Sequence, residues 1–139
     1  MKNRFIFFCY LLFILNCSNA IIEIRSPLSV KEYPICLVDI PDDPWNYSED
    51  ISKHFKKLGF IVIFSDNSEK KADIIAHATY DCHWDVFYRT FNSFNMTIED
   101  ATSGKLLASA NYHGGFGFNS CTKALNLVFS ELKKQLKMY

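Results

Sequence analysis

The sequence is poor in glycine and proline, and neither sign of charge is in excess. Its 139 residues include five glycines, four prolines, 15 basic side chains and 15 acidic side chains. This composition excludes collagen-like and low-complexity disordered chains, and the length fits one domain. A formal net charge of zero argues against nucleic-acid binding through a general basic field. Five cysteines are too few for a small protein built on disulfides.

Long apolar runs are also missing. The eleven residues 5–15 form an unbroken apolar and aromatic run, about half of the roughly 20 residues that a membrane-spanning helix needs. Lys2 and Arg4 precede this run, and small residues follow it. A basic start, a short apolar core and a small-residue exit are typical of a secretory signal. We therefore expect residues 1–20 to be a signal peptide rather than a buried first helix.

Two processing sites are open at the end of this leader. Ser18-Asn19-Ala20 places small residues where signal peptidase reads them, and cleavage there would secrete a chain that begins at Ile21. Alternatively, Ile14-Leu15-Asn16-Cys17 resembles a bacterial lipobox, with a signal at residues 1–16 and a lipid on Cys17. Asn16 departs from the small residue that this pattern prefers. The lipidated form predicts an anchor in the outer membrane of a Gram-negative bacterium, facing the periplasm.

Removal of the leader changes the charge of the chain. Residues 1–16 contain Lys2 and Arg4 and no acidic residue, which leaves 13 basic against 15 acidic side chains. No polybasic stretch remains to attract anionic lipid or nucleic acid.

The first half of the remaining chain predicts a parallel strand pair. Residues 21–33 show no clear period, so we expect a tether or an edge segment before a domain at residues 34–139. Residues 35–40 and 60–64 are continuous apolar runs, the pattern of strands covered on both faces or nearly so. Between them, Ser48 can cap a helix with an apolar stripe, and Gly59 can end it. Such a strand–helix–strand unit predicts a right-handed crossover.

The second half predicts an antiparallel sheet and a last helix. From residue 74 the apolar period is two, which places one set of side chains on the core face: Ile74, Ala76, Ala78, Tyr80, Cys82 and Trp84. Residues 94–99 alternate in the same way, residues 100–105 predict a hairpin loop, and residues 106–113 predict the return strand with Leu106 inside. Gly114-Gly115-Phe116-Gly117 lacks the lysine of a phosphate-binding loop and predicts a turn. Residues 120–136 follow a helical period.

These elements predict an α/β fold, in detail an α+β two-layer sandwich. The expected order is β-α-β-β-β-β-α, with one mixed sheet and both helices on one face.

Several features of this domain are shared with a known family. They are the helix that ends in Leu58-Gly59-Phe60, the segment Tyr80…Trp84-Asp85…Tyr88, the strand that ends in Ala110-Asn111-Tyr112 and the last helix after Lys123. In these features the chain resembles a family of small, uncharacterised proteobacterial envelope lipoproteins, and the Trp-Asp pair is the most specific of them. In topology the family is similar to the amino-terminal domain of the Tol-system propeller protein and to the curli-secretion lipoprotein. The resemblance implies a lipid-anchored, periplasm-facing module with no assigned catalytic residue.

A set of polar residues on the strand from residue 74 is a candidate metal site. His77, Asp81 and His83 share the face opposite the core, and His113 on the return strand can join them. Histidine and carboxylate suit zinc, copper or nickel. Neighbours on one face of a strand are about 6.6–7 Å apart, so a shared metal needs a cross-strand partner. The alternative is a solvated polar face, and we expect neither a metal nor a cofactor.

Three cysteines remain in the domain, Cys36, Cys82 and Cys121. In an oxidising compartment Cys82 can pair with either of the others, and the alternative is that all three are buried thiols. Cys82 and His83 point to opposite faces of a strand, which argues against a catalytic cysteine–histidine pair.

The chain therefore predicts a non-enzymatic module of the cell envelope that binds another protein through its polar sheet face or an edge strand. Trp84, Asp85 and Tyr88 are the candidates for contact with that partner. The alternative is an exported small-ligand or metal-binding protein that uses the histidine-rich and aspartate-rich face.

Overall fold

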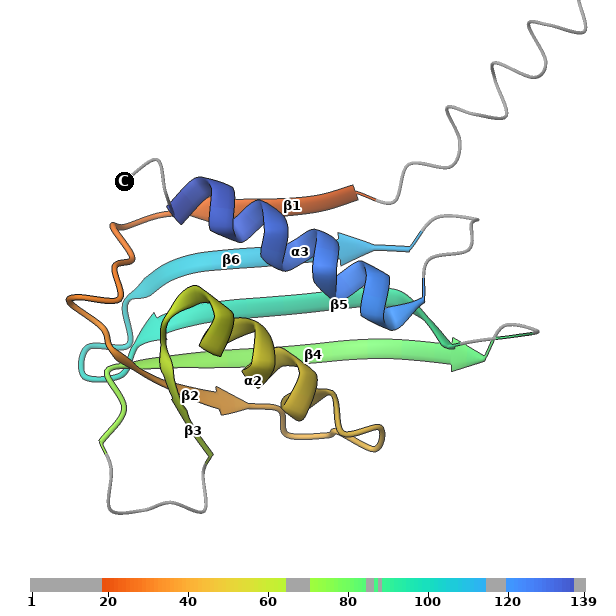
Figure 1. Ribbon diagram of the computed structural model, residues 1–139, viewed down its shortest axis with the longest axis horizontal. Coiled ribbons are helices and arrows are strands. Elements are labelled where there is room, and N and C mark those ends of the chain that lie inside the picture. Colours follow the sequence, from red (N-terminus) through yellow and green to blue (C-terminus); the bar gives the residue numbers. More distant parts are fainter. Residues whose placement is uncertain (1–18, 65–70, 85–86, 88, 115–119, 137–139) are drawn as a thin grey trace, which may run out of the picture.

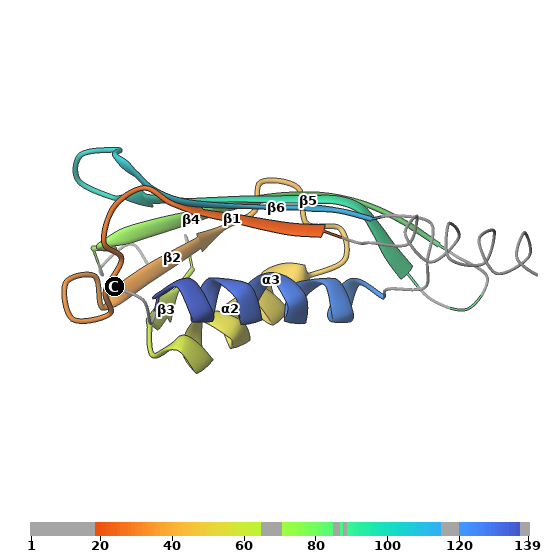
Figure 2. The ribbon, with the colours of Figure 1, turned by 90° about the horizontal axis from the view of Figure 1, so that it is seen from above.

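A computed structural model describes residues 19–64, 71–84, 87, 89–114 and 120–136, and in it one sheet is covered by helices on one face (Figures 1 and 2). The described elements follow one another as β1 (Asn19–Ile24), β2 (Ile35–Asp39), α2 (Tyr47–Leu58), β3 (Ile61–Ile63), β4 (Ile74–Trp84), β5 (Arg89–Asp100), β6 (Leu106–His113) and α3 (Cys121–Leu136). None of the described helices is long and apolar enough to cross a membrane.

The sheet is mixed, with the strand order β1-β6-β5-β4-β2-β3. β2 runs parallel to β3 and β4, while the pairs β4–β5, β5–β6 and β1–β6 are antiparallel. Both helices lie against the same face, as Figure 2 shows. The expected two-layer α/β architecture is confirmed.

The sheet begins earlier in the chain than residue 34. Residues 19–24 form the edge strand β1, in which Ala20 pairs with Tyr112 and Ile24 pairs with Ala108. Ile22 is buried against the core, whereas Ile21 on the opposite face is 59% exposed. Ile21, Ile22 and Ile24 place apolar side chains on both faces of β1, so no alternation marks the strand in the sequence. Of the tether and the edge segment left open for residues 21–33, the edge segment describes residues 21–24.

The strands expected at residues 35–40 and 60–64 are not covered on both faces, because both helices lie on one face of the sheet, and β2 alternates between half-buried and buried residues. β3 has three residues at the edge of the sheet, and the side chain of Ile61 is 55% exposed. β2 has β3 on one side and β4 on the other, so β3 is left with one neighbour. Within β3, Val62 packs against the core, whereas Ile61 lies at its edge.

The core lies between the sheet and the two helices. Ile51 and Phe55 of α2 and Leu125, Val128 and Leu132 of α3 are at most 1% exposed, as the helical periods predict. The imidazole of His54 stacks on Phe129 of α3, with ring centroids 4.6 Å apart. One expected position in β6 is wrong: Leu107 is buried instead of Leu106, because the register shifts between Ile98 and Glu99 of the neighbouring strand.

Candidate interaction site

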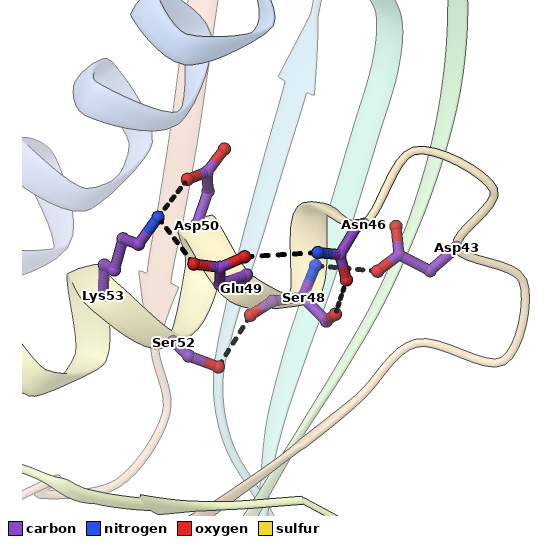
Figure 3. Close-up of polar contacts among 7 residues, drawn as sticks. All are labelled: Asp43, Asn46, Ser48, Glu49, Asp50, Ser52 and Lys53. Carbon is purple, nitrogen blue, oxygen red and sulfur yellow. Dashed lines mark hydrogen bonds and ion pairs between the residues drawn. The ribbon is translucent and has the colours of Figure 1, made fainter.

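The start of α2 is held by Asp43 rather than by the expected cap Ser48. The Asp43 carboxylate accepts hydrogen bonds from the backbone N–H groups of Tyr47, at 2.7 Å, and Ser48, at 2.8 Å. Figure 3 shows the carboxylate of Asp43 beside the first turn of α2. In the sequence, Asn46 lies between Asp43 and this turn. Asn46 adopts a left-handed conformation with φ 57°, and this turn brings Asp43 back to the free donors of the helix.

Asp43 is a strong acceptor in this position. Burial acts to raise the pKa of its carboxyl, but hydrogen bonds from Ser48, Tyr80 and Tyr47 outweigh that effect and hold the pKa below its usual value. The carboxylate also lies where the positive end of the helix dipole favours it. The ionised form is thus the one that the fold selects.

Tyr80 links this cap to the sheet. Its hydroxyl donates to Asp43 Oδ1 at 2.7 Å and accepts the backbone N–H of Trp45 at 3.4 Å. Burial and then the bond to Asp43 raise the pKa of this phenol. Its ring packs edge-on against Tyr47, with centroids 5.0 Å apart, and both rings contact Phe91. The loop that carries Trp45 is therefore held against β4 by a polar contact above an aromatic cluster.

An arginine lies between the two tryptophans of the chain. The guanidinium carbon of Arg89 is 3.6 Å from the ring centroid of Trp45 and 4.8 Å from that of Trp84. Trp84 ends β4, Arg89 begins β5, and the two are paired in the antiparallel register. Both distances are within the range of about 6 Å in which a cation is attracted to an aromatic face.

The alternation with Tyr80 and Cys82 predicted that Trp84 belongs to the core. This prediction is wrong. The side chain of Trp84 is 64% exposed. The strand continues past the point where α3 begins at Cys121, so no helix covers Trp84, and its ring lies on Arg89 instead. Figure 1 shows β4 extending beyond the start of α3.

We call Trp45, Trp84, Phe87 and Arg89 together the aromatic end. Phe87 follows β4 and is 87% exposed, and Trp45 is 41% exposed. Of the three residues expected to contact a partner, Trp84 is in this group, while Asp85 and Tyr88 lie outside the described residues. Trp45 and Arg89 were not predicted. The sequence feature that could have identified Trp45 is a tryptophan within the otherwise polar, proline-rich segment 41–46.

The expected metal ligands lie apart from one another on the polar face of the sheet. His77 bonds to Asp39 at 2.8 Å, Asp81 accepts from Asn92 at 2.7 Å, and His83 lies 3.1 Å from the hydroxyl of Thr90. His113 and Asp81 lie on either side of Ser93, two strands apart. Within the described parts of the chain, no three histidine, cysteine or acidic side chains lie close enough to hold a metal ion.

A cavity lies at the other end of the molecule, between the carboxyl ends of the two helices. It has a volume of about 290 Å³, and its lining includes Leu28, Lys57 and Lys133. Drug-sized ligands occupy pockets of about 300–1,000 Å³, so this one is at the lower limit. No histidine or carboxylate of the polar face lines it.

Cys82 and Cys121 lie side by side, with their sulfurs 3.5 Å apart. Cys36 is fully buried on β2, where burial raises the pKa of its thiol to about 12. Of the two partners left open for Cys82, the structure places Cys121 within contact.

Comparisons with known proteins show a fold relation. No protein-family model and no curated protein sequence matches the chain. Similar solved structures include two of the PelC dodecamer from Paraburkholderia phytofirmans, with TM-scores of 0.63 and 0.62, 12% identity, 84% and 86% of this chain covered, and 96% and 97% of theirs. A PDZ domain protein from Parabacteroides distasonis has a TM-score of 0.50 and 10% identity, over 91% of this chain and 39% of that one. The chain thus has a distant α/β fold relation to these proteins.

Proposed function

We propose that the chain is an exported domain of the bacterial cell envelope that binds another protein through the aromatic end. The observation that carries this proposal is the guanidinium of Arg89 between two indoles, of which Trp84 is 64% exposed. Tryptophan and arginine are enriched among the residues that dominate binding energy at protein interfaces.

Contacts within the chain hold three of the four residues of the aromatic end before any partner binds, Trp45, Trp84 and Arg89. Tyr80 and Asp43 hold the Trp45 loop, and the guanidinium of Arg89 lies over the rings of Trp45 and Trp84. Binding loses less conformational entropy when the contacting side chains already occupy one geometry. This pre-organisation supports a recognition role for the aromatic end.

The charge of the chain favours a protein over a lipid surface as the binding partner of the aromatic end. Exposed tryptophan and phenylalanine also occur at membrane interfaces, but stable peripheral binding adds attraction between basic side chains and anionic lipids. Without residues 1–16 the chain has 13 basic against 15 acidic side chains. The domain therefore lacks the excess positive charge that would direct the aromatic end to a membrane.

Export rests on the leader, and the fold supports lipidation at Cys17 over cleavage after Ala20. Cleavage after Ala20 removes the first two residues of β1, which pair with His113 and Tyr112. Cleavage before Cys17 leaves the strand whole. The resemblance of the Trp84-Asp85 segment to envelope lipoproteins supports the same assignment. In this form the lipid anchors the domain at the membrane. The role that we propose for the domain is non-enzymatic.

A photo-reactive amino acid introduced at Phe87 tests the proposal in intact cells. Phe87 is 87% exposed, and Ile61, 55% exposed on the edge strand β3 outside the aromatic end, is the matched control position. We expect a protein adduct of discrete mass from position 87 and none of that mass from position 61. Because the PelC neighbours are dodecamers, an adduct of two chain masses would identify the partner as a second copy.

Variants of arginine decide whether the adduct depends on the aromatic end. Arg89→Ala removes the cation between the indoles, and Arg25→Ala removes an exposed arginine that pairs with Glu23 outside the aromatic end. We expect the first variant to lose the adduct and the second to keep it. Equal adducts from positions 87 and 61, or a lipid adduct from position 87, would refute a protein-binding aromatic end.

A further inference from the structure

We propose that Cys82 and Cys121 form a disulfide that joins the end of β4 to the first residue of α3. The two residues are 39 positions apart in the chain, and their sulfurs are 3.5 Å apart. The proposal shares with the proposed function only the export of the chain to an oxidising compartment, where disulfides form and persist.

The backbone around the two cysteines is already held together. Next to Cys121, Ser120 forms an isolated bridge with Thr90, and Thr90 is paired with His83 beside Cys82. A disulfide needs a sulfur–sulfur distance of about 2.05 Å, so the two sulfurs must approach by about 1.5 Å. We expect rotation of the two side chains to supply this movement, because the bridge between Ser120 and Thr90 already holds the two backbones near each other.

Cys36 is excluded as the partner of Cys82 by its place in the sheet. Cys36 pairs with Ile74 at the start of β4, whereas Cys82 lies near the end of the same strand. At roughly 3.3 Å per residue the two are about 25 Å apart. The register therefore leaves Cys121 as the partner.

The oxidation is a two-electron exchange with a disulfide-bearing thiol oxidant. The thiolate of Cys82 attacks the disulfide of the oxidant, forms a mixed disulfide and releases one thiol of the oxidant. The thiolate of Cys121 then attacks the sulfur of Cys82, forms the Cys82–Cys121 bond and releases the second thiol. Two protons and two electrons pass from the protein to the oxidant.

The burial of Cys121 determines at which stage of folding this exchange is fast. Cys121 is 2% exposed, and burial raises the pKa of its thiol to about 12. A buried thiol with so high a pKa supplies little thiolate for the second step. We infer that the bond forms as α3 docks on the sheet and before the two thiols are fully buried, and that the folded reduced protein oxidises slowly.

The pairing is tested on the full-length chain, exported and purified with free thiols blocked during lysis. Peptide mapping without reductant should join the peptide of Cys82 to that of Cys121 and find Cys36 blocked. The variant Cys36→Ala should leave this linkage unchanged. Blocked thiols at both Cys82 and Cys121, or a linkage that includes Cys36, would overturn the proposal.

Refolding separates this proposal from export and from partner binding. In oxidised glutathione, the reduced chain refolded from denaturant should form the linkage at least about 10-fold faster than the folded reduced protein. Oxidation should raise Tm by roughly 10 °C for a chain of this size, and Cys82→Ala should abolish that rise. Equal rates of linkage in the refolding and the folded chain would contradict formation during folding, and absence of the linkage in both would contradict the bond, whatever the crosslinking at Phe87 shows.

Discussion

The hydroxyl of Tyr80 donates a 2.7 Å hydrogen bond to the carboxylate of Asp43, and this contact ties the loop before α2 to the sheet. The same carboxylate caps the first turn of α2, and the same hydroxyl accepts the backbone N–H of Trp45. One pair of side chains thus connects the start of a helix, the middle of a strand and the position of an exposed indole.

Replacement of Asp43 by alanine removes two helix-capping bonds and the partner of Tyr80. We expect the free energy of unfolding to fall by about 1–2 kcal/mol, the range for loss of a helix cap. Tyr80→Phe keeps the cap and the aromatic cluster and should cost about 1 kcal/mol. Urea unfolding at pH 7 measures both. Because hydrogen bonds lower the pKa of Asp43, its stabilisation is complete above the usual pKa and is lost as pH falls through the lowered one. We expect Asp43→Ala to cost more than Tyr80→Phe, because it removes the cap as well as the bond to Tyr80, and an equal loss would show that the cap contributes nothing.

His54 predicts a second pH dependence, at milder acidity. Burial against α3, and then the charge of Lys57, lower the pKa of its imidazole, which stacks on Phe129, while Asp50 acts in the opposite direction. The neutral form is therefore favoured in the fold, and its contribution is complete above the ordinary pKa of 6.5 and is lost as pH falls through the lowered one. We expect Tm to fall between pH 7.5 and pH 5, and His54→Phe to reduce that fall. Thermal unfolding across this range checks it, and an unchanged slope in the variant would contradict it.

Gly114 is required for a close approach of two backbones. A Cβ at this position would collide with the carbonyl oxygen of Phe91, while the Gly114 N–H donates to the carbonyl of Asn92 at 2.9 Å. We expect Gly114→Ala to lower the free energy of unfolding by about 1–3 kcal/mol, as overpacking does. Gly104→Asn is the control, because Gly104 has φ 68° with no atom within 4 Å of a Cβ, and asparagine tolerates this conformation. We expect it to change stability by about 0.5 kcal/mol or less. Equal effects in urea unfolding would refute the steric argument.

The mature amino terminus distinguishes the two processing sites. We expect mass spectrometry of protein from membranes to find a lipid-modified Cys17, because this start leaves β1 and its pairs with His113 and Tyr112 whole. Cys17→Ala should then release the chain from the membrane fraction or leave its precursor uncleaved. A start at Ile21 without lipid would refute the anchor and retain export.

Much of the fold was predictable from residues close together in the chain. Ile51 and Phe55 show the buried stripe of α2, Gly59 ends that helix, and the alternation from Ile74 to Ala78 predicts the core face of β4. These patterns are local because a helix or a strand repeats its buried positions every few residues. The two-layer class followed from the same local patterns, whereas the leader stays a prediction.

Tertiary structure alone decided the rest, because it depends on pairs of residues that are distant in the chain. Strand order made β3 an edge strand and left Ile61 exposed, and the length of β4 beyond α3 left Trp84 uncovered. The same packing placed Arg89 between two indoles 39 residues apart in the chain and brought Cys82 to Cys121. A sequence records which side chains alternate along each element, but the partner of each face is set when the elements pack together.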